Sequence, residues 1–169
     1  ENPDLVAAMG AAYVRGLQGE NFDAEWRIIS TAKHFLGDGA TDKGYDRGNA
    51  TISDDKLRAI HLPPYIAAIE QGVQSVMASF NQINGVHQHV DSLRLTVLLK
   101  KELGFDGYVI ADWEGIENST TPGAAGNYSG SYTGVSSTDA VKNAINAGID
   151  MAMVPQSSGT FIDAMKSLV

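Results

Sequence analysis

An acidic residue followed by an aromatic one stands at the end of the most strand-like stretch of this sequence. Tyr108, Val109 and Ile110 are strong strand formers without polar alternation, which is typical of a strand covered on both faces. Asp112 and Trp113 follow. A carboxylate in this place lies where parallel α/β proteins bind their ligands, and the indole offers a flat apolar face for the C–H groups of a sugar ring. The pattern also fits an acid that caps a helix or begins a turn.

Two basic residues end a second predicted strand. Lys33 and His34 close the segment 28–34 and precede a Gly-Asp-Gly turn at 37–39. A lysine offers three hydrogen-bond donors, and a neutral histidine offers one donor and one acceptor, so the pair can bind hydroxyl groups. Because neighbouring strand residues point to opposite faces, both can reach one ligand only if the strand ends there.

Phe80 ends a third predicted strand, 73–80, and so places an aromatic ring in a position like that of Trp113. A polar loop is predicted over 81–85. His87 and His89 stand two residues apart, but no carboxylate or third histidine follows at the spacing of a metal site. The sequence therefore predicts no metal site and no cofactor.

Helices and strands alternate along the chain. The apolar residues Leu5, Met9 and Tyr13 fall near a 3.6-residue period, which predicts a helix over 4–18 with this side facing the core. Pro64 is expected to break or kink a helix over 56–71. Long loops are predicted at 37–52 and, from low complexity, at 117–137. The remaining predicted elements are a strand at 107–112, another at 148–154, and helices at 91–103, 139–146 and 159–169.

This alternation predicts an α/β fold with parallel strands and helices packed outside them. The chemically useful side chains follow the strands' carboxyl ends, where a (β/α)8 barrel keeps its active site. A barrel needs eight strands and roughly 250 residues, so four strands in 169 residues would make about half of one. An open doubly wound sheet fits the alternation equally well, and the pattern leaves both architectures open.

The composition of the chain argues against several classes of binding partner. The net charge is −8 and the sequence pI is about 4.8, which argues against nucleic acid or an anionic membrane as a partner. The chain has no cysteine, so disulfides and thiolate metal sites are excluded. No apolar run approaches the roughly 18 residues that span a bilayer. The chain starts at Glu1 without a methionine and runs directly into a helix, so we expect it to be the interior of a longer polypeptide.

Five motifs in this order together resemble glycoside hydrolase family 3, the β-glucosidases and exo-acting β-glucanases. They are AKHFLGDGAT at 32–41, LPPY at 62–65, VMASFNQING at 76–85, GFDGYVIADW at 104–113 and AGIDM at 147–151. The resemblance covers essentially the whole chain. It implies part of that family's N-terminal (β/α)8 barrel, with about four strands and their flanking helices.

The resemblance also implies a role for individual residues. Asp112 matches the catalytic nucleophile, and Trp113 matches the aromatic residue that lines the non-reducing-end subsite. Lys33 and His34 match the pair that hydrogen-bonds the terminal glucose. Phe80 stands where the family usually has tyrosine, so the hydroxyl is lost and the apolar contact is kept.

The implied activity is retaining hydrolysis of β-glucosides or β-glucans from the non-reducing end. A retaining enzyme needs a second carboxyl about 5–5.5 Å from the nucleophile, which this family takes from a later domain. We therefore expect the fragment alone to be inactive and to need the remainder of the longer polypeptide. The resemblance further implies a secreted or periplasmic location.

Two other readings of the residues stay open. One is a barrel aldolase that uses Lys33 to form a Schiff base with its substrate. The other is a non-catalytic carbohydrate-binding module derived from the same family, in which Trp113 and Phe80 hold a sugar without turnover.

Overall fold

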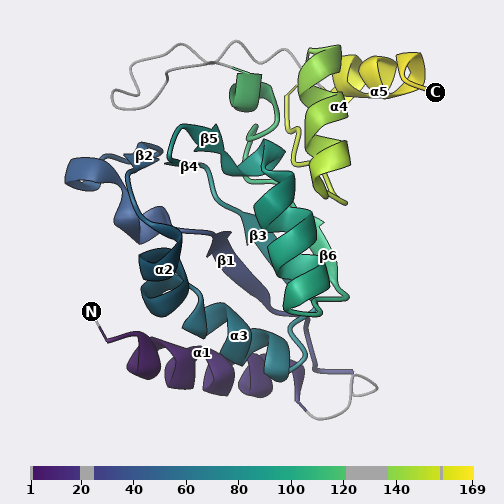
Figure 1. The fold of residues 1–169 in the computed structure, drawn as a ribbon. Helices are drawn as coiled ribbons and strands as arrows, with labels where there is room; N and C mark the ends of the chain where they lie inside the picture. The colour runs from purple at the N-terminus through teal and green to yellow at the C-terminus, as the bar shows by residue number, and fades with distance from the viewer. Residues whose placement is uncertain (1, 20–24, 121–136, 157) are drawn as a thin grey trace.

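A parallel three-stranded sheet forms the centre of the molecule. The computed structural model describes residues 2–19, 25–120, 137–156 and 158–169. The sheet has the strand order β1-β3-β6 and consists of β1 Thr31–Phe35, β3 Ser75–Ala78 and β6 Tyr108–Ile110 (Figure 1). Helices connect the successive strands, so the predicted α/β alternation is confirmed for these three.

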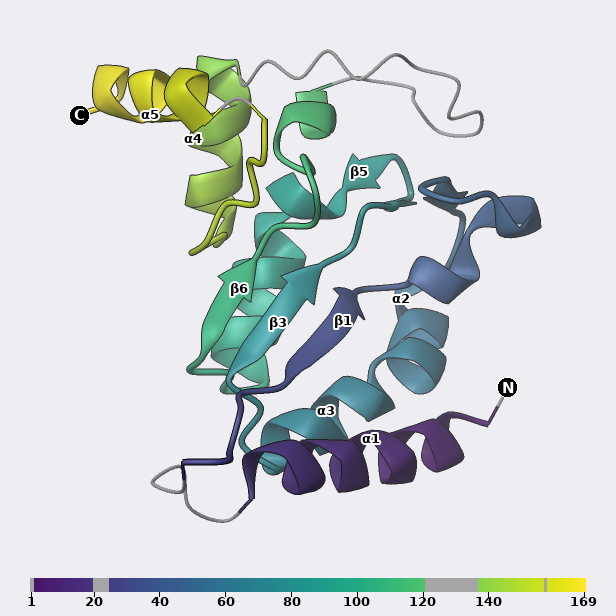
Figure 2. The same cartoon turned by 180° about the vertical axis from the view of Figure 1, so that it is seen from behind.

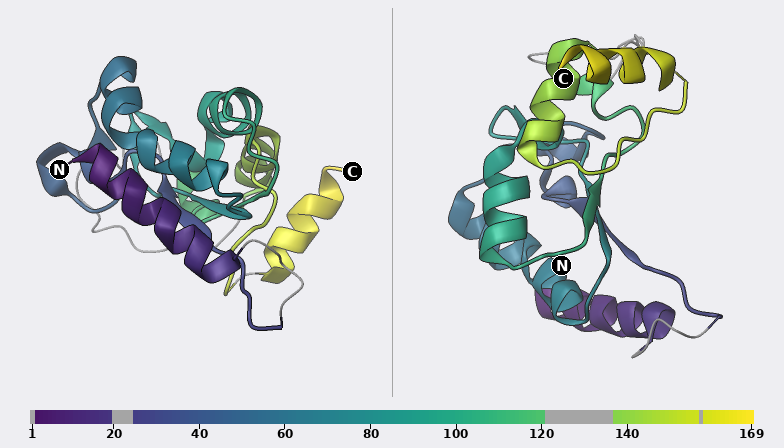
Figure 3. Two further views of the ribbon diagram at one scale, coloured as in Figure 1. Left: turned by 90° about the horizontal axis from the view of Figure 1, so that it is seen from below. Right: turned by 90° about the vertical axis from the view of Figure 1, so that its right-hand side faces the viewer.

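The helices lie on one face of this sheet. Figure 2 shows the three strands side by side, with none of the described helices in front of them. At one end α1 packs on α3, and at the other end α4 packs on α5 (Figure 3). The bounds are α1 Pro3–Gln18, α2 Asp54–Lys56, η3 Leu57–His61, α3 Pro63–Glu70, η5 Leu93–Glu102, α4 Thr138–Ala147 and α5 Ser158–Ser167.

Because one face is covered, β6 is buried in alternation. Val109 is fully buried and its neighbours Tyr108 and Ile110 are half-buried. The prediction of a strand covered on both faces is therefore wrong for the described residues. The core fills the space between the sheet and the helices, with Phe35, Leu36, Leu57, Val76, Leu95, Leu99 and Val109 inaccessible to solvent.

The predicted fourth strand at 148–154 is wrong. Only one bridge, between Ile110 and Met151, continues the sheet there among the residues that the structure describes. The side chain of Asp150 accepts the N–H of Val109 at 2.8 Å, which is the donor that a longer ladder would use. Asp150 also binds Lys100 at 2.7 Å, so its carboxylate ends the pairing after a single residue.

Helix α1 presents a different side to the core from the one predicted. Leu5, Met9 and Tyr13 are exposed, whereas Val14 and Gln18 are buried. The Gln18 amide donates to the carbonyl of Gly72 at 2.8 Å, so a polar contact at the helix end helps to fix its rotation.

The predicted helix break at Pro64 lies within one residue of the observed one. Helix α3 begins at Pro63, one residue before the predicted break at Pro64. A proline is tolerated in this first helical position because its missing N–H would have no partner within the helix.

A second small sheet has two of its strands within the predicted loops at 37–52 and 81–85. It contains β2 Asn49–Ala50, β4 Gln82–Ile83 and β5 Val86–His87. Asn84 and Gly85 join β4 to β5 with φ of 50° and 85°, the left-handed pair that an Asn-Gly hairpin turn requires. The prediction of a polar loop over 81–85 is therefore wrong. Short turns complete this side: η1 Asp38–Ala40, η2 Asp42–Gly44, η4 Gln88–Val90 and η6 Glu117–Thr120.

Most of the low-complexity loop predicted at 117–137 lies outside the described residues, and its first part forms η6. None of the helices in the described ranges is long and apolar enough to cross a membrane.

Candidate active site

The chain turns sharply directly after β6, and this turn carries Asp112. The N–H of Ala111 still bonds to the carbonyl of Met151 at 2.8 Å, and the N–H of Gly115 then closes on the carbonyl of Asp112 at 3.0 Å. The Trp113 N–H donates to Asp112 Oδ1 at 2.7 Å. One carboxylate oxygen is thus held by the backbone, and the Trp113 ring beside it is half exposed.

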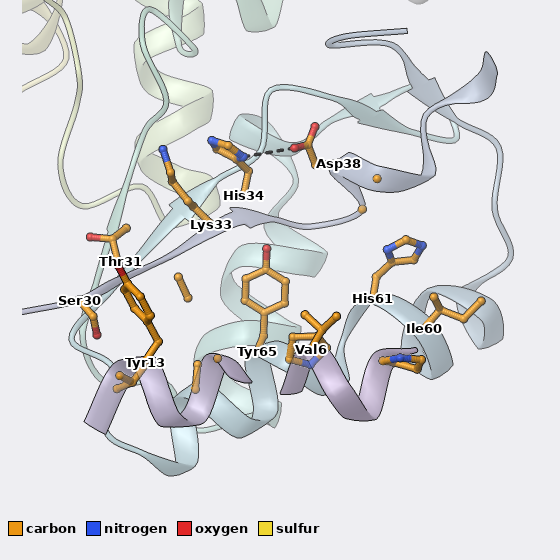
Figure 4. Close-up of a pocket in the computed structure, with 18 of the residues that line it drawn as sticks. Val6, Tyr13, Ser30, Thr31, Lys33, His34, Asp38, Ile60, His61 and Tyr65 are labelled. Atoms are coloured by element: carbon orange, nitrogen blue, oxygen red, sulfur yellow. Dashed lines mark hydrogen bonds and ion pairs between the residues drawn. The ribbon is translucent and has the colours of Figure 1, made fainter. Parts of the chain in front are cut away.

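A bulge brings Lys33 and His34 to the same side of β1. Ala32 pairs with Val76 and Phe35 with Ala78, so three steps on β1 oppose two on β3. An extra residue of this kind disturbs the strict alternation of side chains. Both side chains line the same cavity (Figure 4). The expectation that the strand must end at His34 is therefore wrong, because the strand continues to Phe35 through the bulge.

The imidazole of His34 lies between two carboxylates. Its Nδ1 is 3.2 Å from Asp38 Oδ2, and its Nε2 is 3.8 Å from Asp112 Oδ2. The hydrogen bond from His34 lowers the pKa of Asp38, against the opposing effect of burial. Asp38 was not predicted as a site residue. Its signal was present, since it follows His34 by four residues in the Gly-Asp-Gly turn.

A cavity of about 550 Å³ adjoins these residues between α1, β1 and α3. Lys33, His34 and Asp38 border it, and Tyr65 points its ring toward them (Figure 4). Asp112 and Trp113 are not among the described residues that line it. His34 therefore lines the cavity and also contacts the turn after β6 through Asp112.

Phe80 is not on an open surface. It is buried, and the guanidinium of Arg47 stands 4.2 Å from its ring centroid. The ring of His89 meets it edge to face, with centroids 5.8 Å apart. The structure thus brings Asp112 and His34 into proximity, whereas Phe80 is buried against His89 and Arg47. Arg47, which covers this ring, was missed by sequence reasoning because it lies in the predicted long loop.

His89 was also missed as a site residue. It is fully buried, and its Nε2 accepts the N–H of Asp112 at 2.9 Å. Burial and the neighbouring His87 lower the pKa of His89 to about 3. His87 itself lies 3.0 Å from the Gln82 amide. The described residues contain no group of three or more side chains that could hold a metal ion.

The arrangement combines a carboxylate with neighbouring hydrogen-bonding groups. Asp112 Oδ1 is fixed by a backbone N–H, while Oδ2 faces an imidazole rather than a backbone donor. A carboxylate oriented in this way can attack an electrophilic carbon and form a covalent ester. His34 contacts this carboxylate and, together with Lys33, lines the neighbouring cavity.

Comparisons with known proteins agree in pointing to one family. The profile of the "Glycosyl hydrolase family 3 N terminal domain" matches residues 1–169. A beta-xylosidase of Formosa agariphila is 37% identical over 158 residues, which cover 91% of this chain and 21% of that protein. A lysosomal beta glucosidase of Dictyostelium discoideum is 36% identical over 161 residues, which cover 92% of this chain and 19% of that protein.

A solved structure shows the same arrangement of elements. The chain superposes on a mutant of the exo-1,3/1,4-beta-glucanase ExoP from a Pseudoalteromonas species with a TM-score of 0.81 and 40% sequence identity. The match covers 99% of this chain and 25% of the glucanase. The chain therefore spans about a fifth to a quarter of the proteins that it resembles.

Proposed function

The chain belongs to glycoside hydrolase family 3, and we propose that it supplies the nucleophile and part of the sugar-binding site of a retaining, exo-acting β-glucosidase or exo-β-glucanase. The observation that carries this proposal is the placement of Asp112. Its carboxylate follows the strand β6, has one oxygen held by Trp113 N–H, and has the other 3.8 Å from His34.

In the proposed reaction, Asp112 Oδ2 attacks the anomeric carbon of the terminal sugar as the bond to the leaving oxygen breaks. A second carboxyl group donates a proton to that oxygen. Water then attacks the same carbon, gives its proton to the second group, and releases Asp112. The two inversions produce net retention. The hydrogen bond from Trp113 N–H helps to keep Oδ1 away from the reacting carbon.

The second carboxyl belongs to the remainder of a longer polypeptide in this proposal. A retaining pair needs carboxyl groups about 5–5.5 Å apart. Among the described residues, the ionisable side chain that contacts the Asp112 carboxylate is the imidazole of His34. Because the chain spans about a fifth of the curated relatives, the rest of the sequence has ample room for the acid. The 169-residue chain alone is then inactive.

The terminal sugar lies between the basic pair and the indole. The bulge in β1 directs Lys33 and His34 to one side, where they can hydrogen-bond sugar hydroxyls. Trp113 supplies an exposed flat face for the C–H side of the ring. Phe80 contributes by packing on His89 rather than as a platform of its own.

Membership of glycoside hydrolase family 3 supports two broader proposals. The parallel sheet, with its helices on one face, forms part of a (β/α)8 barrel whose other strands lie elsewhere in the polypeptide. The mature protein acts in a secreted or periplasmic setting. The Dictyostelium relative supports this location, because it is named for the lysosome, a compartment outside the cytosol.

Proton NMR of the first product tests the proposal. The longest natural polypeptide that contains this chain is mixed with an aryl β-glucoside, and the anomer is read before mutarotation. We expect β-glucose to form first, whereas α-glucose would overturn the retaining assignment. An aryl β-xyloside measured in parallel decides the sugar preference, since one relative is named a beta-xylosidase.

A further inference from the structure

His89 accepts a hydrogen bond from the backbone N–H of Asp112. It lies on the short turn η4, which follows the hairpin strand β5, and it reaches across to the end of β6. The Asp112 N–H lies beyond the last residue of that strand. Buried backbone donors need a partner, and here the Nε2 of His89 takes the place of a strand carbonyl at 2.9 Å.

This hydrogen bond fixes the tautomer of His89. A ring nitrogen can accept a hydrogen bond only when it carries no proton, so Nε2 is bare and the proton lies on Nδ1. The Nδ1 atom is buried and has no hydrogen-bond partner among the described residues. The orientation of the ring is therefore set by packing and by the single bond to Asp112.

The packing around the ring leaves His89 little freedom to turn. Phe80 meets it edge to face, with the two centroids 5.8 Å apart. In addition, a Cβ added at Gly115 would overlap His89 Nε2, so only a glycine lets the chain pass this close. The imidazole is therefore packed both against an aromatic ring and against the turn that carries Asp112.

We propose that His89 is a positioning residue for the Asp112 carboxylate, acting through the Asp112 peptide N–H. Asp112 is then held at both ends, by His89 on its N–H and by Trp113 N–H on Oδ1. The remaining oxygen, Oδ2, faces the side of His34. This inference rests on the proposed role of Asp112 as the nucleophile and adds a residue that does not touch the substrate.

Two substitutions of His89 separate its acceptor from its volume. His89→Gln keeps an amide oxygen at about the distance of Nε2, whereas His89→Leu fills a similar space with no acceptor. His87→Leu is the matched control, because His87 is also largely buried but bonds to Gln82 and not to Asp112. All are made in the longest natural polypeptide and compared at equal folded fraction.

We expect His89→Leu to lower kcat on an aryl β-glucoside by roughly 10²-fold, the scale of a misplacement of about 1 Å. The KM should stay within about threefold, because His89 makes no sugar contact. His89→Gln should recover most of kcat, and His87→Leu should keep it. Equal losses in the Leu and Gln variants, or an unchanged kcat in His89→Leu, would overturn the proposal.

Two further measurements cover the remaining outcomes. If His89→Leu does not fold, His89→Asn replaces it. The shorter amide of asparagine cannot reach the Asp112 N–H. Equal rates in the Asn and Gln variants would overturn the proposal.

Amide hydrogen exchange at Asp112 can be measured without any enzymatic activity. It should be slow in the wild type and His89→Gln and fast in the variant that lacks the acceptor. A wild type that protects this amide but hydrolyses nothing would refute the proposed function, while unprotected exchange would refute the role of His89.

Discussion

His34 Nε2 lies 3.8 Å from Asp112 Oδ2, although β3 separates the strands that carry the two residues. The contact forms because the carboxyl ends of β1 and β6 reach the same edge of the sheet and because the bulge in β1 turns His34 toward it. Two segments far apart in the sequence thus meet at a carboxylate that has one oxygen available for chemistry.

Asp112→Asn tests the carboxylate itself. We expect hydrolysis by the longer polypeptide to fall on the order of 10³-fold or more, which corresponds to about 4 kcal/mol of transition-state stabilisation. An amide cannot form the glycosyl ester, but it can still contact the sugar. Glucose affinity measured by calorimetry should therefore change little.

The matched control is Asp106→Asn, an exposed carboxylate just before the opposite end of β6. It should retain full activity. A loss in both variants would point to an effect on the strand rather than on the chemistry, and full activity in Asp112→Asn would contradict the account.

Asp38→Asn tests how His34 is oriented. Asp38 Oδ2 accepts from His34 Nδ1 at 3.2 Å and so fixes the ring that faces Asp112. A weaker acceptor should loosen the ring and raise KM by about threefold to tenfold, on the scale of about 1 kcal/mol for one hydrogen bond. Steady-state kinetics on an aryl β-glucoside provide the measurement.

Asp55→Asn, at an exposed carboxylate in the first turn of α2, is the control for Asp38→Asn. Its KM should equal that of the wild type. An unaltered KM in Asp38→Asn would show that Asp38 does not orient His34 for binding.

The buried His89 should make stability depend on pH. Burial and His87 lower its pKa in the folded state from 6.5 to about 3, so between these values the unfolded chain binds a proton that the folded chain does not. Lower pH therefore favours unfolding, with a slope of up to about 1.4 kcal/mol per pH unit from this group.

Urea unfolding at two pH values, about 7 and about 4.5, checks this expectation, since both lie above the folded-state pKa of His89 and span its ordinary value. The wild type should lose more stability between the two than His89→Leu, which cannot take up the proton. Both pH values also lie above the range in which Asp38, whose pKa is lowered from 3.8, loses its contribution. Equal losses in the two proteins would mean that His89 titrates normally.

Gly115→Ala should displace His89. The added Cβ would overlap the ring nitrogen, so either the ring or the Asp112 turn must move. We expect a clear drop in both Tm and kcat. Gly10→Ala in α1 is the contrasting case, because a Cβ there meets no described atom within 4 Å and alanine favours a helix by roughly 0.5–1 kcal/mol. A harmless Gly115→Ala would contradict the packing described around His89.

The sequence predicted the parts of this fold that depend on local signals. Tyr108, Val109 and Ile110 form the expected strand, and a proline marks the expected break in the second helix region. The prediction of a strand failed where a side chain takes a backbone hydrogen bond that the strand would need. Asp150 takes the N–H of Val109 and so prevents a fourth strand that its apolar neighbours favour.

The candidate site residues differ in how strong their local signals are. Lys33, His34, Asp112 and Trp113 carry recognisable chemistry at strand ends. The contact of His89 with Asp112 depends on tertiary geometry, because the two residues lie 23 positions apart and no local pattern links them. The contact of Asp38 with His34 is local, and its four-residue spacing in the Gly-Asp-Gly turn was present in the sequence but was not used. The hairpin turn at 84–85 is a second case of this kind, because its Asn-Gly signal was present in the sequence and was interpreted as a loop.

Mechanism-based labelling with a 2-fluoro-glucoside, followed by peptide mapping, tests the central claim most directly. It is made on the longest natural polypeptide that contains the chain. We expect a covalent label on Asp112, because the fluorine slows release of the ester that retaining hydrolysis requires. A polypeptide that binds glucose yet acquires no label on Asp112 would contradict it and favour a non-catalytic carbohydrate-binding module.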